Sequence, residues 1–299
     1  MPTIHEPVLL TEILELLQPR ANENFIDCTF GGGGHSLAIL NRVKPDGKVV
    51  GIDWDFKAAQ DSHNKNLIIV NDNYRNLKKI YEVCEKKLGL GEISGILLDL
   101  GLSSDQLADD DRGFSFEATG QLDMRFDVNS DHPTAAEILT TYSEKQLEGI
   151  FRDYGEEPLA KPIAKALVVA RDKGEDIASA AMLVRLIADI YRKKFRQPSR
   201  KNPATRVLQA LRIAVNDEFG NIKSVLPQAM DILKSGGRLA VISFHSGEDR
   251  IIKTYFKEMA SGDYPRIKII TKKPLVASEA ENVSNPRARS AKLRVAEKI

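Results

Sequence analysis

The stretch Asn24-Phe-Ile-Asp-Cys-Thr-Phe-Gly-Gly-Gly-Gly-His35 joins a short apolar run to four consecutive glycines. Residues 25–30 predict a buried strand, and the helical spacing of residues 36–40 places the glycines in the turn between that strand and a helix. Glycine is needed where the backbone takes a positive φ or where a ligand contacts it closely. The stretch therefore predicts the binding loop of a nucleotide-type cofactor, with a purely structural turn as the alternative.

A second apolar run, Lys48-Val-Val-Gly-Ile52, ends in Asp53. A carboxylate at this strand end can hold both ribose hydroxyls of an adenosine. The glycine loop, the strand and the acid together are more specific for a cofactor than the glycines alone. Asp53 is therefore a predicted cofactor contact.

The details of the loop separate two cofactors, a dinucleotide and S-adenosylmethionine. The dinucleotide fingerprint G-x-G-x-x-G is incomplete, because Ser36 and Leu37 stand where its third glycine would be in the two registers. Asp27 precedes the glycines, and its negative charge suits the cationic amino group of a methionine better than a pyrophosphate. These details favour S-adenosylmethionine with Asp27 as a contact, and a nicotinamide-dependent dehydrogenase is the alternative.

The composition is that of a globular chain. Its 299 residues are 42% hydrophobic and 28% charged, which suits one large or two ordinary domains. No apolar run reaches the about 18 residues of a membrane span, and the first residues lack the basic start of a secretion signal. Cys28 and Cys84 are too few for a disulfide framework or a metal cluster. We therefore expect a cytoplasmic protein with two buried thiols, no metal and no membrane partner.

Strand-like runs alternate with helical ones, which predicts an α/β fold with a parallel sheet and helices on both faces. These runs cover residues 24–30, 48–53, 67–70, 93–99 and 238–243, and the further runs 266–271 and 292–296 are expected to close the sheet. After the fourth run the spacing becomes helical, and Ser143-x-x-Gln146 predicts a capping box. We therefore expect a core of residues 1–104 and 204–299, with residues 105–203 as a helical insertion that recognises the substrate or forms a lid.

Polar side chains follow the fourth and fifth strands at the sheet edge that is expected to hold the cofactor. In Asp99-Leu-Gly-Leu-Ser-Ser-Asp-Gln106, the side chains of Asp99, Ser103 and Ser104 could accept protons from an exocyclic amine. Methyl transfer from a sulfonium to an amine needs in-line approach and hydrogen bonds that hold the amine. For each serine, a helix N-cap is the alternative role. His245, after the fifth strand, is a candidate for binding a phosphate or orienting a base, with a capped side chain as its alternative.

A basic stretch, Tyr191 to Arg206, carries seven Arg or Lys residues and no acid. Tyr191 and Phe195 lie among these cations, and phosphate neutralisation with aromatic stacking suits a single-stranded nucleic acid. A second basic cluster consists of Arg287, Arg289, Lys292 and Arg294. The predicted RNA contacts are Lys193, Lys194, Arg196, Arg200, Lys201, Arg206, Arg287 and Arg289. A solvated run of charges is the alternative.

Long motifs lie along nearly the whole chain. They are His5-Glu-Pro-Val-Leu-Leu-Thr-Glu12, the glycine loop ending Gly-Gly-His-Ser, Asp99-Leu-Gly-Leu-Ser-Ser, Arg112-Gly-Phe-Ser-Phe with Leu122-Asp-Met-Arg125, Tyr154-Gly-Glu-Glu157, Asn202-Pro-Ala-Thr-Arg206 with Gln209-Ala-Leu-Arg-Ile213, Ser243-Phe-His-Ser246 with Glu248-Asp-Arg250, and Asn285-Pro-Arg-Ala-Arg-Ser290. Together they resemble the bacterial small-subunit ribosomal RNA cytosine N4-methyltransferases, the methyltransferase H or MraW-like family, whose motifs follow the same order.

The resemblance implies a Rossmann-like class I S-adenosylmethionine-dependent methyltransferase core with an inserted all-helical domain. It also implies methylation of the exocyclic N4 of one cytidine in the decoding region of small-subunit (16S) ribosomal RNA. The substrate would be the RNA or an assembling small subunit, and the oligomeric state stays open, a homodimer included. The family's cofactor contacts correspond to Gly33, Gly34, His35, Asp53, Tyr74, Asp99 and Gln106.

Two residues depart from the family pattern. Tyr74 stands where the family usually has Phe, which should keep the stacking on adenine. Gly247 replaces a usual Leu and is expected to loosen the turn after His245.

Two other functions stay open at this point. A DNA amino-methyltransferase performs the same chemistry, but its usual Ser/Asp-Pro-Pro-aromatic signature is missing after the fourth strand. A noncatalytic RNA-binding assembly factor would not need Asp27, Asp53 and Asp99 together.

Overall fold

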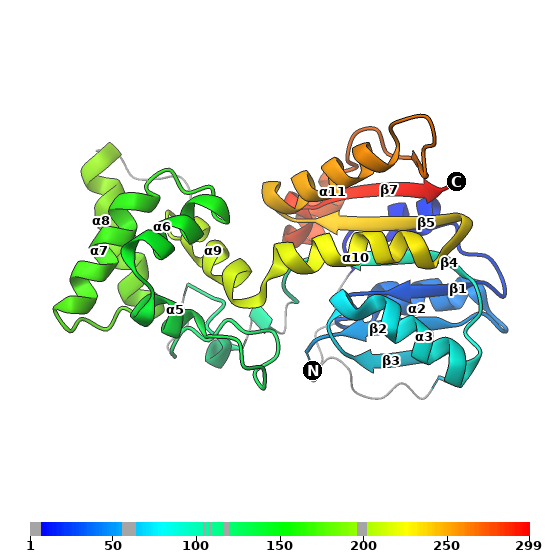
Figure 1. Cartoon of the computed structure of the whole chain (residues 1–299), viewed down its shortest axis with the longest axis horizontal. Coiled ribbons are helices and arrows are strands. Elements are labelled where there is room, and N and C mark those ends of the chain that lie inside the picture. The colour runs from blue at the N-terminus through cyan, green and yellow to red at the C-terminus, as the bar shows by residue number, and fades with distance from the viewer. Residues whose placement is uncertain (1–6, 56–63, 104–105, 108, 117–119, 196–201) are drawn as a thin grey trace. The chain divides into compact units, whose positions relative to one another are not determined.

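The computed structural model describes residues 7–55, 64–103, 106–107, 109–116, 120–195 and 202–299. The chain divides into two compact units, the first formed by Met1–Gly101 with Phe219–Ile299 and the second by Leu102–Glu218. Figure 1 shows the second unit in green as a group of helices, and the first unit as a sheet with helices. The sequence placed the return to the core at residue 204, whereas the structure places it after Glu218.

The first unit contains a seven-stranded sheet in the order β3-β2-β1-β4-β5-β7-β6. Strands β1 to β5 pair in parallel, and β7 is antiparallel to both of its neighbours. The strands are β1 (Asn24–Asp27), β2 (Val49–Asp53), β3 (Leu67–Asn71), β4 (Ile93–Asp99), β5 (Leu233–Ser243), β6 (Ile267–Ile269) and β7 (Lys292–Lys298). The predicted parallel sheet and its closing pair of strands are confirmed, although the first strand ends before the residues expected.

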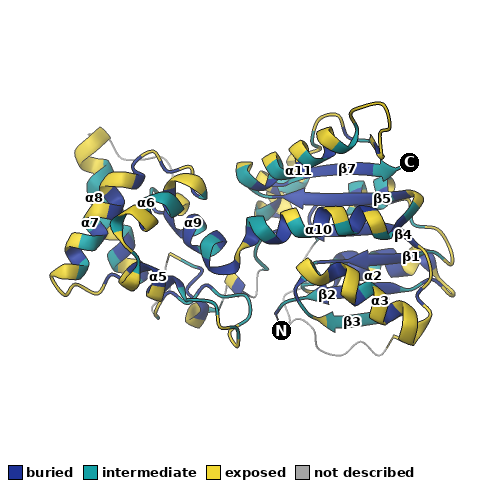
Figure 2. Ribbon diagram, viewed as in Figure 1, coloured by how far each residue is buried: buried dark blue, intermediate teal, exposed yellow. Residues whose placement is uncertain are grey.

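Central strands alternate their side chains between two buried apolar clusters. Phe25 and Leu97 belong to one cluster, whereas Ile26 and Leu98 belong to the other. The first cluster includes residues of α1 (Leu10–Leu17) and α2 (Gly34–Val43), and the second includes residues of α3 (Leu77–Leu88), α10 (Glu218–Ile232) and α11 (Ser246–Met259). Because both faces are covered, the central strands β1, β2 and β4 are almost wholly buried, as Figure 2 shows by their dark blue colour.

The second unit is built from helices around its own apolar core. They are α5 (Ala135–Thr141), α6 (Glu144–Asp153), α7 (Ala160–Asp172), α8 (Ala180–Phe195) and α9 (Thr205–Asn216). Val207 and Leu211 of α9 share one buried cluster with Phe151 of α6 and Ile163 of α7. This packing explains the later boundary, because α9, expected to return the chain to the sheet, belongs to the helical core.

Two sequence motifs of the second unit form local hydrogen bonds in the structure. The Ser143/Gln146 capping box is present, as predicted. Buried Arg112 donates Nη2 hydrogen bonds to the carbonyls of Arg125 and Phe126 at 2.8 and 2.9 Å, which ties the two halves of one motif pair together.

The cysteines and the helices bear on two expectations from the composition. Cys28 and Cys84 are both buried free thiols, as expected. Among the residues that the structure describes, no helix combines the length and the apolar character that crossing a membrane requires.

Candidate active site

Three acids mark one edge of the sheet. Asp27, Asp53 and Asp99 are the last residues of β1, β2 and β4, and β1 lies between the other two strands. These strands are parallel, so their carboxyl ends meet at the edge where ligands bind in open α/β sheets. The three acids singled out from the sequence therefore lie on neighbouring strand tips.

The glycine loop connects β1 to α2 and reaches the tip of β2. Gly31 has a φ of 50°, and its N–H donates a 2.7 Å hydrogen bond to Oδ2 of Asp53. Gly33 has a φ of 76°, and a Cβ placed there would lie 2.8 Å from the ring of Phe30. Both glycines are thus required by backbone conformation, and Gly33 also by packing. The first N–H groups of α2, which begins at Gly34, have no intrahelical acceptor and are available to a ligand.

The buried carboxylate of Asp27 accepts hydrogen bonds from residues on both sides of the glycine loop. Asp27 is 1% exposed, and Oδ2 accepts a 2.7 Å hydrogen bond from Ser36 Oγ. Oδ1 accepts from the N–H and the hydroxyl of Thr29 at 3.1 and 3.3 Å. Ser36 and Thr29 were not recognised as site residues from the sequence, since only the fold shows that they meet Asp27. A contact between Asp27 and the cofactor stays a prediction.

Asp53 presents a carboxylate at the tip of β2. Besides the bond from Gly31, its Oδ1 accepts a 2.7 Å hydrogen bond from the N–H of Asp55. Burial is the largest influence and raises the pKa of Asp53 to about 6, although both backbone hydrogen bonds oppose the rise. Tyr74 begins a 3-10 turn shortly after β3, the strand paired with β2. This placement is compatible with the ribose and adenine contacts predicted for Asp53 and Tyr74.

Asp99 ends β4 with one buried oxygen that has no partner. Its N–H donates a 2.6 Å hydrogen bond to Thr29 Oγ1, which ties the strand to the glycine loop. Oδ2 lies 3.7 Å from His35 Nδ1, whereas Oδ1 has no hydrogen-bond partner in the described part of the chain. Burial raises the pKa of Asp99 to about 6, and the charge of His35 opposes part of this rise. A buried oxygen without a partner at a strand tip is a candidate ligand contact.

Both ring nitrogens of His35 lie close to polar groups of the protein. Nε2 lies 2.9 Å from the carbonyl oxygen of Val8, and Nδ1 faces Asp99. The side chain is 6% exposed. A cofactor contact of His35 stays a prediction, and its backbone N–H at the start of α2 is the group left to make it.

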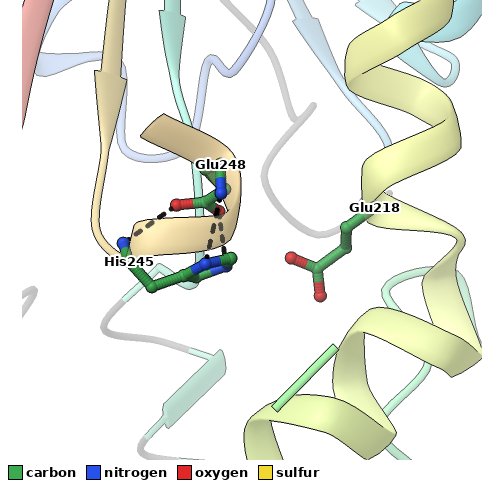
Figure 3. Close-up of side chains that lie close together, drawn as sticks. All are labelled: Glu218, His245 and Glu248. Atoms are coloured by element: carbon green, nitrogen blue, oxygen red, sulfur yellow. Dashed lines mark hydrogen bonds and ion pairs between the residues drawn. The ribbon is translucent and has the colours of Figure 1, made fainter. Parts of the chain in front are cut away.

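His245 is the N-cap of α11. Its Nδ1 accepts a 3.4 Å hydrogen bond from the N–H of Glu248, and its Nε2 lies 3.2 Å from Glu248 Oε1 (Figure 3). Glu248 Oε2 in turn accepts from the N–H groups of Phe244 and His245. Glu218, also labelled in Figure 3, forms a 2.8 Å ion pair with Arg212 in its own unit. The capped side chain considered for His245 accounts for these contacts, and a catalytic role stays a prediction.

Gly247 makes room for an aromatic ring. A Cβ at this position would lie 2.5 Å from Cζ of Phe219, and the ring of Phe219 lies 5.7 Å from the ring of His245. In place of the looser turn expected from the sequence, the missing side chain allows Phe219 to pack against His245.

Ser103 and Gln106 belong to the second unit and form a reciprocal cap. Gln106 N–H donates to Ser103 Oγ at 3.1 Å, and Ser103 N–H donates to Gln106 Oε1 at 3.0 Å. This is the N-cap considered for Ser103, so the cofactor contact of Gln106 and the catalytic role of Ser103 stay predictions. Ser104 lies outside the described residues.

The predicted RNA contacts are found in both units. Lys193 and Lys194 are exposed in the last turn of α8, and Arg206 is exposed in the first turn of α9. Arg287 is half-buried and Arg289 is exposed in a 3-10 helix of the first unit, Pro286–Ser290. The remaining candidates lie outside the described residues, namely Arg196, Arg200 and Lys201.

A buried carboxylate beside α8 was missed from the sequence. The hydroxyl of Tyr191 donates a hydrogen bond to the carboxylate of Glu157 and lies 2.7 and 2.8 Å from its two oxygens. Glu157 is 3% exposed. Burial raises the pKa of Tyr191, and Glu157 adds to the rise. The ring of Tyr191 lies 5.5 Å from the ring of Phe195, which is 51% exposed. Glu157 ends the motif Tyr154-Gly-Glu-Glu157, but its spacing from Tyr191 gives no sign that they meet.

Comparison with known proteins identifies the family. A family model described as the MraW methylase family matches residues 2–299. The chain belongs to this family. A protein of Thermomicrobium roseum named Ribosomal RNA small subunit methyltransferase H is 43% identical over 318 residues, which cover 100% of this chain and 95% of the relative. A protein of the same name from Heliobacterium mobile is 45% identical over 315 residues, covering 99% of each.

Solved structures give a weaker likeness. An rRNA methylase from Streptococcus thermophilus covers 99% of both chains, with 10% sequence identity and a TM-score of 0.42.

The cofactor of this MraW family methylase is S-adenosylmethionine, and the residues at the sheet edge fit it. Asp53 offers carboxylate oxygens for ribose hydroxyls, and the N–H groups at the start of α2 face no intrahelical acceptor. The unpartnered oxygen of Asp99 adds negative charge for a cationic ligand.

Proposed function

We propose that the protein transfers the methyl group of S-adenosylmethionine to the exocyclic N4 of a cytidine in the decoding region of small-subunit ribosomal RNA. The main support is the end-to-end match to relatives named Ribosomal RNA small subunit methyltransferase H at 43–45% identity. The acids on three neighbouring strand tips add chemical support, since a cationic donor and an amine acceptor both favour carboxylates there.

The residues of this chain would divide the work as follows. When bound, S-adenosylmethionine supplies an electrophilic methyl group. Asp53 would hold the ribose, Tyr74 would stack on the adenine, and the backbone at Gly33 to His35 would fix the methionine end. Asp99 would accept a hydrogen bond from the substrate amine and so orient its lone pair toward the methyl group.

The RNA contacts are proposed for the exposed cations. Lys193, Lys194 and Arg206 would neutralise phosphates, and Phe195 offers an exposed ring on which a base can stack. The target cytidine would have to leave its stack to present N4, as in other enzymes that modify bases.

Product analysis tests the proposal. The protein is incubated with S-adenosylmethionine carrying a labelled methyl group and, separately, with small-subunit ribosomal RNA, isolated small subunits and DNA of the same sequence. We expect label in N4-methylcytidine from an RNA or subunit sample, identified by nucleoside mass spectrometry, and loss of label with Asp53→Ala. Label in DNA alone would support the DNA amino-methyltransferase, and label on another base would contradict the N4 assignment.

A further inference from the structure

The first described residues form a strap, defined here as Pro7, Val8 and Leu9, that lies against the start of α2. A Cβ at Gly34 would lie 3.1 Å from Cγ of Pro7, and the Val8 carbonyl faces His35. Leu9 has a φ of 55°, a left-handed conformation that is strained for a residue with a side chain. Its N–H donates a 2.7 Å hydrogen bond to Glu281 Oε1, so the strained strap is fixed at its far end.

The strap decides which nitrogen of His35 carries hydrogen. A carbonyl oxygen can only accept, so Nε2, at 2.9 Å from Val8, must be the protonated nitrogen. In a neutral ring Nδ1 then holds a lone pair, and it faces Oδ2 of Asp99 at 3.7 Å. A lone pair and a carboxylate oxygen attract each other only when one proton lies between them. The pair therefore has room for one proton beyond that on Nε2.

We propose that His35 is a positioning residue for Asp99, with its Nδ1 sharing with Asp99 the proton that the substrate amine loses during methylation. The proposal rests on the proposed function, since it assigns a partner to the proton of the amine. It also gives a role to the N-terminal motif, whose carbonyl at Val8 fixes the ring.

The transfer balances with one proton accepted by the pair. As the N–C bond forms and the C–S bond of the sulfonium breaks, the sulfur becomes a neutral thioether and the amine nitrogen gains a positive charge. The nitrogen then gives one proton to the carboxylate of Asp99, whose buried Oδ1 has no partner in the described part of the chain. His35 Nδ1 shares this proton on the Oδ2 side until it passes to solvent.

The charges around Asp99 allow this protonation near neutral pH. Burial is the largest influence and raises the pKa of Asp99 to about 6. Asp27 and Glu248 raise it further, whereas His35 and Arg287 lower it. These groups come from β1, α11, α2 and the 3-10 helix Pro286–Ser290.

Two variants separate the proton role from packing. His35→Gln keeps an N–H for the Val8 carbonyl but places no group at Nδ1, whereas His35→Asn places an amide near Nδ1. We expect the acid limb of the pH–rate profile of His35→Gln to move up by about one unit, because glutamine lacks the positive charge that the His35 ring places beside Asp99 when Nδ1 holds the shared proton. Below that limb its rate falls about tenfold relative to the wild type. His35→Asn restores part of the shift, which a purely structural role would not predict.

Nuclear magnetic resonance provides a readout that does not depend on activity. The ¹⁵N resonances of His35 and the carboxyl ¹³C resonance of Asp99 are followed against pH in the full chain. We expect Asp99→Asn to move the titration of His35 and His35→Gln to move that of Asp99, while His132, in the second unit, is unchanged by either. Unchanged titrations in both variants, with the fold intact, would overturn the proposal. Coupled titrations in a protein that methylates no RNA would contradict the proposed function and leave the proton pair standing.

Discussion

Asp53 and Asp99 sit half-buried at strand tips of the first unit, whereas Lys193 and Lys194 extend exposed from the last turn of α8 in the second unit. The carboxylate of Asp53 accepts a hydrogen bond from the N–H of Gly31, and the N–H of Asp99 donates one to Thr29 Oγ1. Burial raises the pKa of each acid. Exposed cations act through attraction that salt screens. From this difference we expect changes at the acids to alter chemistry and cofactor binding, and changes at the lysines to alter RNA affinity alone.

The largest expected effect is that of removing the carboxylate of Asp99. Asp99→Ala should lower the methylation rate about 10²–10⁴-fold, the range typical of removing a proton acceptor. Initial rates with labelled S-adenosylmethionine measure it. Glu15→Ala, which removes an exposed acid of α1, is the matched control and should keep the wild-type rate. Full activity of Asp99→Ala would remove Asp99 from the site.

Removing Asp53 should weaken cofactor binding about 10–100-fold, because two hydrogen bonds to a charged group disappear. Protonation should have the same effect in the wild type. The pKa of Asp53 is raised to about 6, so cofactor affinity falls as the pH drops through 6. Calorimetric titration with S-adenosylmethionine at pH 5 and 8 measures both effects. An equal affinity at the two pH values would exclude Asp53 as the ribose contact.

Charge reversal at Lys193 and Lys194 should weaken RNA binding several-fold and leave cofactor binding unchanged. The slope of log affinity against log salt concentration should fall by about one for each phosphate that the variant no longer neutralises. Filter binding at several salt concentrations measures it, with Lys161→Glu/Lys165→Glu on α7, also exposed, as the control. If both double variants give the wild-type slope, the end of α8 does not bind RNA.

The smallest expected effect is on stability. The pKa of Asp99 is about 6 in the folded protein against an ordinary value of 3.8, so the folded state binds its proton more tightly. The stability that this proton provides is complete below pH 3.8 and is lost as the pH rises through 6. Asp99→Asn should therefore raise the free energy of unfolding at pH 8 by about 1–3 kcal/mol, and by less at pH 4.5. Denaturant unfolding of both proteins at both pH values measures this. An equal increase in the free energy of unfolding at pH 8 and pH 4.5 would contradict it.

The sequence predicted the sheet because its signals are local. The apolar run around Asp27 and the runs that end in Asp53 and Asp99 specify buried parallel strands, and a parallel sheet brings their carboxyl ends to one edge without further information. Gly31 and Gly33 likewise follow from the need for a positive φ at the loop.

Contacts between distant residues could not be predicted in the same way. The Val8 carbonyl against His35, Ser36 against Asp27, and Tyr191 against Glu157 depend on packing that no local spacing reveals. The boundary after Glu218 was missed for the same reason. The apolar spacing of α9 fits any helical neighbour, and the structure alone shows that its neighbour is α6.

Single-turnover methylation at saturating RNA tests the contrast between the two regions most directly. Asp99→Ala should fall at least about 100-fold in rate with unchanged RNA affinity, while Lys193→Glu/Lys194→Glu should keep the wild-type rate once RNA saturates it. A wild-type rate for Asp99→Ala, or a slow rate for the lysine variant at saturation, would contradict this assignment of chemistry and binding to separate parts of the molecule.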